Sequence, residues 1–198
     1  MSPWTAIVPW KTAGRRKTRL APALSPPERD RLAQALFDRV ISVLQACPAV
    51  GRISVLSETR PTRDDLDWLP DRGRGLNAEL QAAQIAGPRL IIHADLPLVT
   101  ADDVETLLTA ARGGGAIAPD RHGTGVNALA LDTGVTVRFR FGPDSFARHQ
   151  RQAGARLTVV ARPGLALDVD TPDDLAEALR LGGEAWAAGP NRDDSNHR

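Results

Sequence analysis

An apolar segment near the N-terminus, Ile7-Val8-Pro9-Trp10-Lys11, runs directly into Gly14-Arg15-Arg16-Lys17-Thr18-Arg19-Leu20. The apolar part is typical of a short buried strand, and the loop after it holds five cations and no acid. Like charges gathered at a strand end repel one another, and each loses hydration where the loop packs down. This density of cations suits an anion such as a polyphosphate, whose oxygens fixed Lys and Arg donors would stabilise. The alternative is a solvated basic loop.

The chain has 198 residues, of which 42% are hydrophobic, and its formal net charge is +1. This size suits one α/β domain with a real core, and the balanced charge gives no support to nucleic-acid binding. The single cysteine, Cys47, excludes an internal disulfide and a multi-cysteine metal site, and we expect it to be buried near a helix end. No apolar run reaches the ~18 residues of a membrane span, and no signal-peptide pattern opens the chain. We therefore expect a cytoplasmic protein without membrane contact.

Short apolar runs alternate with helical patterns along the chain. Runs in which successive residues are apolar predict strands buried on both faces, as in a mostly parallel sheet. The predicted strands are Thr5–Val8, Ile53–Leu56, Leu90–His93, Ala116–Ala118, Ala128–Leu131, Leu157–Val160 and Leu167–Val169. The alternation predicts a single-domain, three-layer α/β/α fold with a mostly parallel, mixed sheet over residues 1–183. Residues 184–198 lose the apolar pattern, and we expect a mobile tail there.

Three helix starts share one pattern, a hydroxyl residue followed three positions later by an acid, which predicts a capping box. These starts lie at Ser25, Thr100 and Thr171. We expect a fourth helix over Leu76–Ala86 and a fifth from Asp144 or Ser145 to Gly154. In such a fold, ligands bind beyond the carboxyl ends of the strands, where the unusual loops of this chain lie.

Acidic residues follow two of the predicted strands. Asp95 stands in Ala94-Asp95-Leu96-Pro97, and Mg²⁺ prefers one or two carboxylates together with water and phosphate oxygens. Alternatively, Asp95 only caps the turn. Asp168 and Asp170 lie two positions apart in an extended segment, so they point the same way and repel unless a cation or donors lie between them. The alternative for Asp170 is a residue that leads into the Thr171 helix cap.

Glycine-rich loops complete the candidate sites. Gly123-Thr124-Gly125-Val126-Asn127 has a backbone that can approach a small anion closely, or it is an ordinary hairpin turn. Ser145, in Phe141-Gly142-Pro143-Asp144-Ser145, stands at a helix N-terminus that attracts anions, or it serves only as a cap. Gly75 and Asn77 open another helix, and the Asn77 amide suits a base edge or a ribose. Neither a Walker A motif nor a dinucleotide-binding G-x-G-x-x-G motif is present.

Between Ile7 and Leu179 the chain carries, in order, V-P-W-K-x5-K-x-R-L, G-L-N, A-D-L-P, G-T-G-x-N-A-L, F-G-x-x-S-F-x-x-H and D-x-D-T-P-x-D-L. This series resembles the 2-phospho-L-lactate guanylyltransferases, which make part of the deazaflavin coenzyme F420. A-D-L-P and D-x-D-T-P are shared with related nucleotidyltransferases, whereas G-T-G-x-N-A-L and F-G-x-x-S-F-x-x-H are the specific part. The resemblance implies a GT-A-like nucleotidyltransferase fold. It also implies transfer of GMP from GTP to 2-phospho-L-lactate, phosphoenolpyruvate or 3-phosphoglycerate, with release of pyrophosphate and no covalent intermediate.

The resemblance also implies roles for individual residues. The nucleotide is expected at Pro9, Lys11, Lys17, Arg19, Gly75, Asn77 and Pro97, with Lys11, Lys17, Arg19 and Asp95 as the catalytic residues. Mg²⁺ is expected on Asp95 with Asp168 or Asp170. The acceptor is expected at Thr124, Asn127, Gly142 and Ser145, where His149 either adds charge or is a surface histidine. Expected partners are GTP, the phosphorylated acid, a second copy of the chain in a homodimer, and a downstream transferase that takes the product.

Two positions depart from the family pattern. Val126 stands where members often carry a second threonine, which removes a hydroxyl from the acceptor loop and leaves the choice among the three acids open. Trp10 stands where smaller apolar residues are common and fills the strand end. Two other functions also stay open: another nucleotidyltransferase, of the cytidylyl or molybdopterin type, and a non-catalytic nucleotide-binding module.

Overall fold

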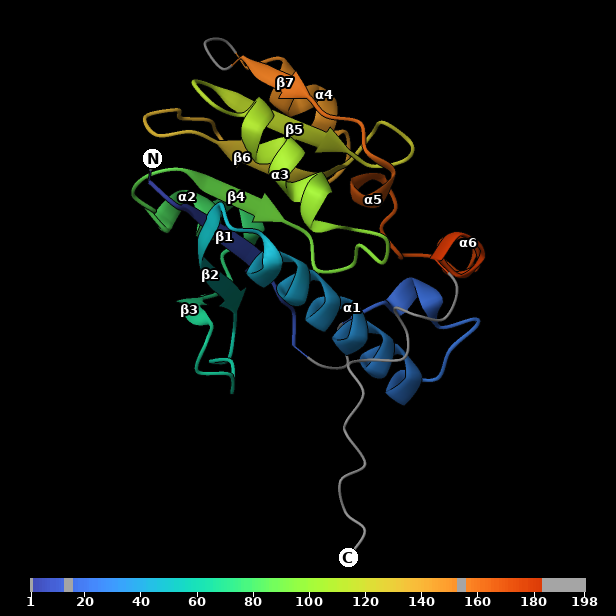
Figure 1. Cartoon of the computed structure of the whole chain (residues 1–198). Helices are drawn as coiled ribbons and strands as arrows, with labels where there is room; N and C mark the ends of the chain where they lie inside the picture. Colours follow the sequence, from blue (N-terminus) through green and yellow to red (C-terminus); the bar gives the residue numbers. More distant parts are fainter. Residues whose placement is uncertain (1, 13–15, 153–155, 183–198) are drawn as a thin grey trace, which may run out of the picture.

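The computed structural model describes residues 2–12, 16–152 and 156–182 (Figure 1). Among these residues, seven strands form one sheet in the order β3-β2-β1-β4-β6-β5-β7. The strands are β1 (Trp4–Pro9), β2 (Val50–Ser57), β3 (Asp67–Pro70), β4 (Arg89–Ile92), β5 (Gly115–Pro119), β6 (Val126–Leu131) and β7 (Leu157–Val159). β6 runs antiparallel to both of its neighbours, and the other pairs are parallel. The predicted mostly parallel, mixed sheet is confirmed.

Helices cover both faces of this sheet (Figure 1). They are η1 (Thr18–Leu20), α1 (Pro26–Ala46), α2 (Leu76–Ala82), α3 (Ala101–Ala110), α4 (Ser145–Gln150), α5 (Pro163–Ala166) and α6 (Pro172–Gly182). On one face, α1 and α3 pack against Ile92 and its neighbours in a single core cluster. On the other face, α2 and α4 pack against Ile91. Adjacent strand residues therefore face opposite apolar layers, which explains the unbroken apolar runs and confirms the three-layer fold.

The position of β1 creates the site. β1 lies between β2 and β4, so the chain leaves it toward one side of the sheet and later returns on the other side. The loops that follow β1 and β4 therefore diverge from neighbouring carboxyl ends. Such a switch point opens a crevice in which ligands bind. Lys11 and Lys17 follow β1, and Asp95 follows β4.

The three predicted capping boxes are present. Backbone N–H groups donate to the carboxylate three residues later over 2.8, 3.0 and 2.7 Å in the pairs Ser25–Glu28, Thr100–Asp103 and Thr171–Asp174. Because each box satisfies donors that the first helical turn leaves free, it fixes where α1, α3 and α6 begin. Cys47 caps the other end of α1 and is buried, as predicted, and this burial raises the pKa of its thiol.

The strand predicted at Leu167–Val169 is wrong. Leu167 and Val169 are buried, but in a cluster with Leu20 of η1 and Leu36 of α1 rather than in the sheet. The Val169 N–H donates to the carbonyl of Asp95 (3.1 Å), outside any strand pairing. Two buried apolar residues in alternation imitate a strand, because sequence does not distinguish burial in a sheet from burial under helices.

Other boundaries also differ from the predictions. The helix expected to reach Ala86 ends at Ala82, and Gln84 then adopts a left-handed φ of 42°. The fifth helix ends at Gln150, whereas its predicted end at Gly154 lies outside the described residues, as does the predicted tail over 184–198. The sequence also missed β3, η1 and α5, which have four, three and four residues and are too short to leave a periodic pattern.

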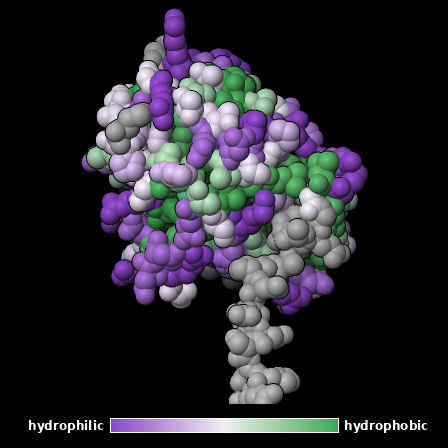
Figure 2. Space-filling view, in the orientation of Figure 1, coloured by the Kyte–Doolittle hydropathy of each residue, from purple (hydrophilic) through white to green (hydrophobic). Residues whose placement is uncertain are grey.

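Hydrophilic side chains cover much of the face seen in Figure 2, with apolar residues between them. Among the described residues, no helix combines the length and the apolar character that crossing a bilayer requires.

We predict that Ile91→Ala lowers the free energy of unfolding by about 2–5 kcal/mol, because it leaves a cavity in the layer between the sheet and α2. Ile91 is fully buried on β4, which lies inside the sheet between β1 and β6. Urea denaturation of both proteins measures the difference. Val159→Ala, on an edge strand with 47% of the residue exposed, is the control and costs about 0.5 kcal/mol or less. Equal losses in the two variants would contradict the assigned core.

Candidate active site

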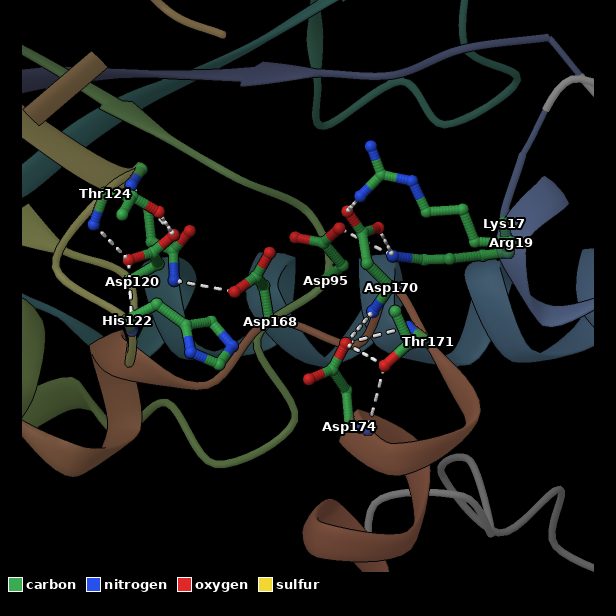
Figure 3. Close-up of polar contacts among 12 residues, drawn as sticks. Lys17, Arg19, Asp95, Asp120, His122, Thr124, Asp168, Asp170, Thr171 and Asp174 are labelled. Atoms are coloured by element: carbon green, nitrogen blue, oxygen red, sulfur yellow. Dashed lines mark hydrogen bonds and ion pairs between the residues drawn. The ribbon is translucent and has the colours of Figure 1, made fainter. Parts of the chain in front are cut away.

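The loops after β1 and β4 enclose a cavity of about 400 Å³. Of the residues expected in the site, seven line it: Pro9, Lys11, Lys17, Arg19, Asp95, Asp168 and Asp170. The basic loop and the aspartates therefore meet at one cavity. Lys17 Nζ lies 2.6 Å from Asp95 Oδ2 and 3.4 Å from Asp170 Oδ1, and Arg19 Nη1 lies 3.5 Å from Asp170 Oδ2 (Figure 3).

Lys17 holds this cluster together. Its side chain is 7% exposed, and its backbone adopts a left-handed φ of 50°, which is uncommon for a residue with a side chain and is found mainly where the surroundings enforce it. Burial disfavours the charged ammonium, but the carboxylates of Asp95 and Asp170 outweigh burial and raise the pKa of Lys17. Burial likewise disfavours the Asp95 carboxylate, and Lys17 outweighs it, so the pKa of Asp95 is lowered. Both groups therefore stay charged at neutral pH.

Three carboxylates lie side by side in Figure 3. Ligand atoms of Asp95, Asp168 and Asp170 all lie within 4.8 Å of one another. Lys17 contacts Asp95 Oδ2, while Asp95 Oδ1 is buried and accepts no hydrogen bond from the described residues. Buried carboxylate oxygens are rarely left without a partner. Burial, with the nearby Asp95 carboxylate, also raises the pKa of Asp168. This donor set fits a hard divalent cation.

Asn127 orients the Asp168 carboxylate by a hydrogen bond. Its side chain is buried on β6, and Nδ2 donates to the carbonyls of Leu165 (3.0 Å) and Ala166 (3.1 Å) and to Asp168 Oδ1 (3.3 Å). These contacts occupy the Asn127 amide N–H groups. The residue expected to touch the acceptor thus holds the backbone and the carboxylate of the metal-binding segment.

Trp10 fills the strand end, as its size suggested, and supports the basic loop. Its ring packs 4.4 Å from that of Phe37, and the Arg16 guanidinium lies over it at 3.8 Å from the centroid. Such cation–π contacts attract the guanidinium to the ring. Arg16 Nε also donates to the Lys11 carbonyl (2.5 Å). These contacts tie the start of the loop to its later part.

Sequence reasoning favoured His93 as a strand residue, but it lies directly after β4 and lines the cavity. Its ring centroid lies 5.8 Å from that of Phe141, and its backbone N–H donates to the Asn127 carbonyl (2.9 Å). Its place two residues before Asp95 was the available signal, because the end of a strand is where a side chain turns from the core toward the crevice.

The loop before α2 is built around Glu79. This buried carboxylate accepts the N–H groups of Arg72 and Arg74, each at 3.0 Å, and the guanidinium of Arg74 at 2.7 Å. The bond from Arg74 lowers the pKa of Glu79 to about 2 against the opposing effect of burial. Gly75 is exposed and needs its positive φ of 87° to enter the helix. Leu76, rather than Gly75, lines the cavity.

Asn77 and Pro97, both expected at the nucleotide, have other surroundings. Asn77 Nδ2 donates to the Phe141 carbonyl (3.0 Å), and Asn77 Oδ1 accepts the Phe141 N–H (2.7 Å). The amide therefore pairs with the backbone of the segment that leads into α4. Pro97, two residues after Asp95, is buried.

The Gly123-Thr124-Gly125 loop is organised by Asp120. Its carboxylate accepts the N–H groups of His122 (3.1 Å), Thr124 (2.9 Å) and Gly125 (2.8 Å), and the Thr124 hydroxyl (3.2 Å) (Figure 3). The Thr124 carbonyl accepts the Phe146 N–H (3.1 Å), which joins this loop to the start of α4.

Of the residues expected at the acceptor, Thr124 and Gly142 are exposed, whereas Ser145 is buried. Val126 is also buried, within the apolar layer beside α2 and α4. Val126 stands where family members often carry threonine, so this chain places a methyl group in the core where threonine has its hydroxyl.

His149 fits neither expectation. It is fully buried, so it is no surface histidine. Its Nδ1 contacts the Ser145 carbonyl (2.8 Å) and its Nε2 accepts the Arg140 N–H (3.1 Å), an arrangement that requires the neutral ring. Burial lowers the pKa of His149 and outweighs the opposing effect of the Ser145 carbonyl, and the charge of Arg140 also lowers it. His149 is therefore a structural link between α4 and the 138–141 segment, and it adds no charge.

Three partly buried aspartates beside a lysine at a switch point can bind a cation together with a phosphate-bearing ligand. A solved structure from Desulfovibrio desulfuricans, described as that of a nucleotide-diphospho-sugar transferase, shares this fold. Its TM-score is 0.73 over 93% of this chain and 89% of that chain, at 15% identity. The fold is therefore the one seen in a nucleotide-diphospho-sugar transferase.

The family follows from sequence. The chain belongs to the CofC-like guanylyl transferases, which it matches over residues 4–188. A phosphoenolpyruvate guanylyltransferase of Sphaerobacter thermophilus is 38% identical over 208 residues, covering 96% of this chain and 97% of that protein. One of Salinispora arenicola is 37% identical over 191 residues, covering 90% and 89%.

We predict that Glu79→Gln destabilises the protein most at neutral pH. The folded-state pKa of Glu79 is about 2 against an ordinary 4.5, so the ionised carboxylate stabilises the fold above pH 4.5 and this contribution is lost as pH falls toward 2. Urea midpoints of both proteins, measured across this pH range, should converge in acid. Glu105→Gln, at an exposed position on α3, is the control, and a pH-independent effect of the Glu79 change would contradict the assignment.

Proposed function

We propose that this protein transfers GMP from GTP to phosphoenolpyruvate and releases pyrophosphate, a step in the biosynthesis of the coenzyme F420. The observation that carries the proposal is the meeting of Lys17 and Arg19 with Asp95, Asp168 and Asp170 around one cavity. The names of the relatives at 38% and 37% identity supply the acceptor. 2-Phospho-L-lactate and 3-phosphoglycerate are the other acceptors to be tested.

Asp95, Asp168 and Asp170 would hold Mg²⁺ in this reaction. The buried, unpartnered Asp95 Oδ1 supports that assignment, because Lys17 already occupies Oδ2 of the same carboxylate. When bound, Mg²⁺ would neutralise charge on the phosphate oxygens and on the leaving pyrophosphate.

The basic loop would hold the triphosphate. Lys17 is charged and placed within the cluster, and Arg19 beside it is exposed enough to meet a ligand, with 74% of its side chain accessible. Lys11 and Pro9 line the same cavity. Donors fixed before the substrate arrives need no reorganisation as charge moves toward the leaving group.

The chemistry is a direct displacement at phosphorus. An oxygen of the acceptor's phosphate attacks the α-phosphorus of GTP, and a new P–O bond forms. The bond from that phosphorus to the oxygen that bridges to the β-phosphate breaks, and pyrophosphate leaves with the electron pair. An ionised phosphate is already a nucleophile at neutral pH, so the side chains need only align the reactants and stabilise charge.

The nucleoside and the acceptor would lie on either side of the reacting phosphates. We assign the guanosine to the loop of Gly75, whose shape Glu79 fixes, with Asn77 holding the neighbouring backbone of Phe141. We assign the acceptor to Thr124, Gly142 and Ser145, because the Thr124 and Phe146 backbones are joined there. Asn127 acts on the reaction by positioning Asp168.

The test of this function is pyrophosphate release from GTP, Mg²⁺ and each of the three acids in turn, with CTP in place of GTP as the comparison. We expect release with GTP and phosphoenolpyruvate, and a product that contains guanosine joined to the acid by a diphosphate. Folded protein that releases no pyrophosphate with any of the acids would refute the proposal.

We predict that Asp95→Asn lowers kcat by about 100-fold or more, as expected when one group that stabilises transition-state charge is removed. The circular dichroism spectrum should stay unchanged, because the amide has the size of the carboxyl group. Asp64→Asn, in an exposed loop, is the control for removal of one negative charge. An Asp95 variant with full turnover would contradict the metal assignment.

A further inference from the structure

One carboxylate outside the cavity contacts both the backbone of Asp170 and a distant arginine. Asp174 is 6% exposed at the start of α6. Its Oδ2 accepts the N–H groups of Asp170 (3.1 Å) and Thr171 (2.7 Å) and the Thr171 hydroxyl (2.8 Å) (Figure 3). Its Oδ1 lies 2.5 Å from Arg121 Nη2. Asp174 Oδ2 therefore contacts the segment that carries Asp170, and Asp174 Oδ1 contacts the β5–β6 loop.

The segment that carries Asp168 and Asp170 needs such support. It belongs to no strand, and Val169 ties its backbone to the Asp95 carbonyl rather than to a ladder. Side-chain contacts therefore decide where its carboxylates point. Asn127 supplies them for Asp168, and Asp174 supplies them for the backbone of Asp170.

Arg121 is itself held in place. It lies in the turn that Asp120 closes, where the Asp120 N–H donates to the Gly125 carbonyl (3.1 Å). Arg121 Nε donates to His122 Nε2 (3.2 Å), so the guanidinium is fixed on two sides. The Arg121 side chain is 31% exposed and that of Asp174 is 8% exposed. Solvent and salt therefore screen this ion pair less than a pair in open solvent.

We propose that Arg121 is a positioning residue for the metal site, acting through Asp174 to hold the Asp170 carboxylate beside Asp95 and Asp168. This inference rests on the proposed function only in taking the three aspartates as metal ligands. Partners one step removed from the ligands orient them, and loss of such a partner typically costs about 10–100-fold in metal affinity.

The sign of the effect separates positioning from simple charge. Arg121 is a cation near a cation site, so deletion of its charge alone would tighten metal binding by reducing repulsion. Loss of positioning instead weakens binding, because Asp174 would no longer be anchored to the β5–β6 loop and Asp170 would sample other orientations.

The experiment measures Mn²⁺ binding by the full-length protein, without GTP or acceptor, through the electron paramagnetic resonance signal of free Mn²⁺. We expect Arg121→Ala to raise the Mn²⁺ dissociation constant about tenfold, and Arg121→Lys to recover part of that loss because it keeps a donor to Asp174. The thermal midpoint is measured on the same samples to show that each variant is folded.

Arg63→Ala is the matched control. Arg63 has a similar exposure of 37%, forms an ion pair with Asp65, and contacts none of the three aspartates. It should bind Mn²⁺ like the unaltered protein. Unchanged or tighter Mn²⁺ binding by a folded Arg121→Ala protein would overturn the inference while leaving guanylyl transfer untouched. Mn²⁺ binding that Asp95→Asn does not weaken would overturn the metal site itself.

Discussion

The partly buried contact between the Lys17 ammonium and the Asp95 carboxylate, 2.6 Å apart, constrains the rest of the site. Neither charge is stable alone in a cavity wall, because desolvation of an unpaired ion costs more than most single contacts return. The pair joins the loop after β1 to the loop after β4 across the switch point of the sheet. The left-handed backbone at Lys17 is a consequence, since the chain must turn sharply to deliver this side chain between Asp95 and Asp170.

Around this pair, several groups of the site are positioned by residues that do not line the cavity. Asn127 holds Asp168, Asp174 holds the backbone of Asp170, and Asp120 and Glu79 shape two loops that the sequence assigned to substrates. Preorganised charge is effective only when its supports are rigid. The motifs of this chain therefore contain both residues that line the cavity and residues that support them, and spacing alone does not separate the two kinds. Asn127 and His149 belong to the second kind.

Much of the architecture was predictable from local patterns. The strands were recognisable because central strands bury both faces, and the three capping boxes were recognisable because hydroxyl and acid must lie three residues apart. The convergence of Lys17 with Asp95 was predictable from the rule that loops beyond strand ends meet. Leu167–Val169 misled, because apolar residues buried beneath α1 and η1 leave the same trace as a strand.

The sequence by itself determined the layered fold, the capped helices, the family and the three aspartates, because each of these depends on residues close together in the chain or on motifs of fixed spacing. Only the tertiary structure decided which side chains reach the cavity. It gave Asn127 and Asn77 backbone partners, made His149 a neutral buried link and brought His93 to the cavity wall. The reason is physical: a polar side chain pairs with whichever groups the fold places within hydrogen-bonding distance, and those groups lie 4 to 64 residues away along the chain.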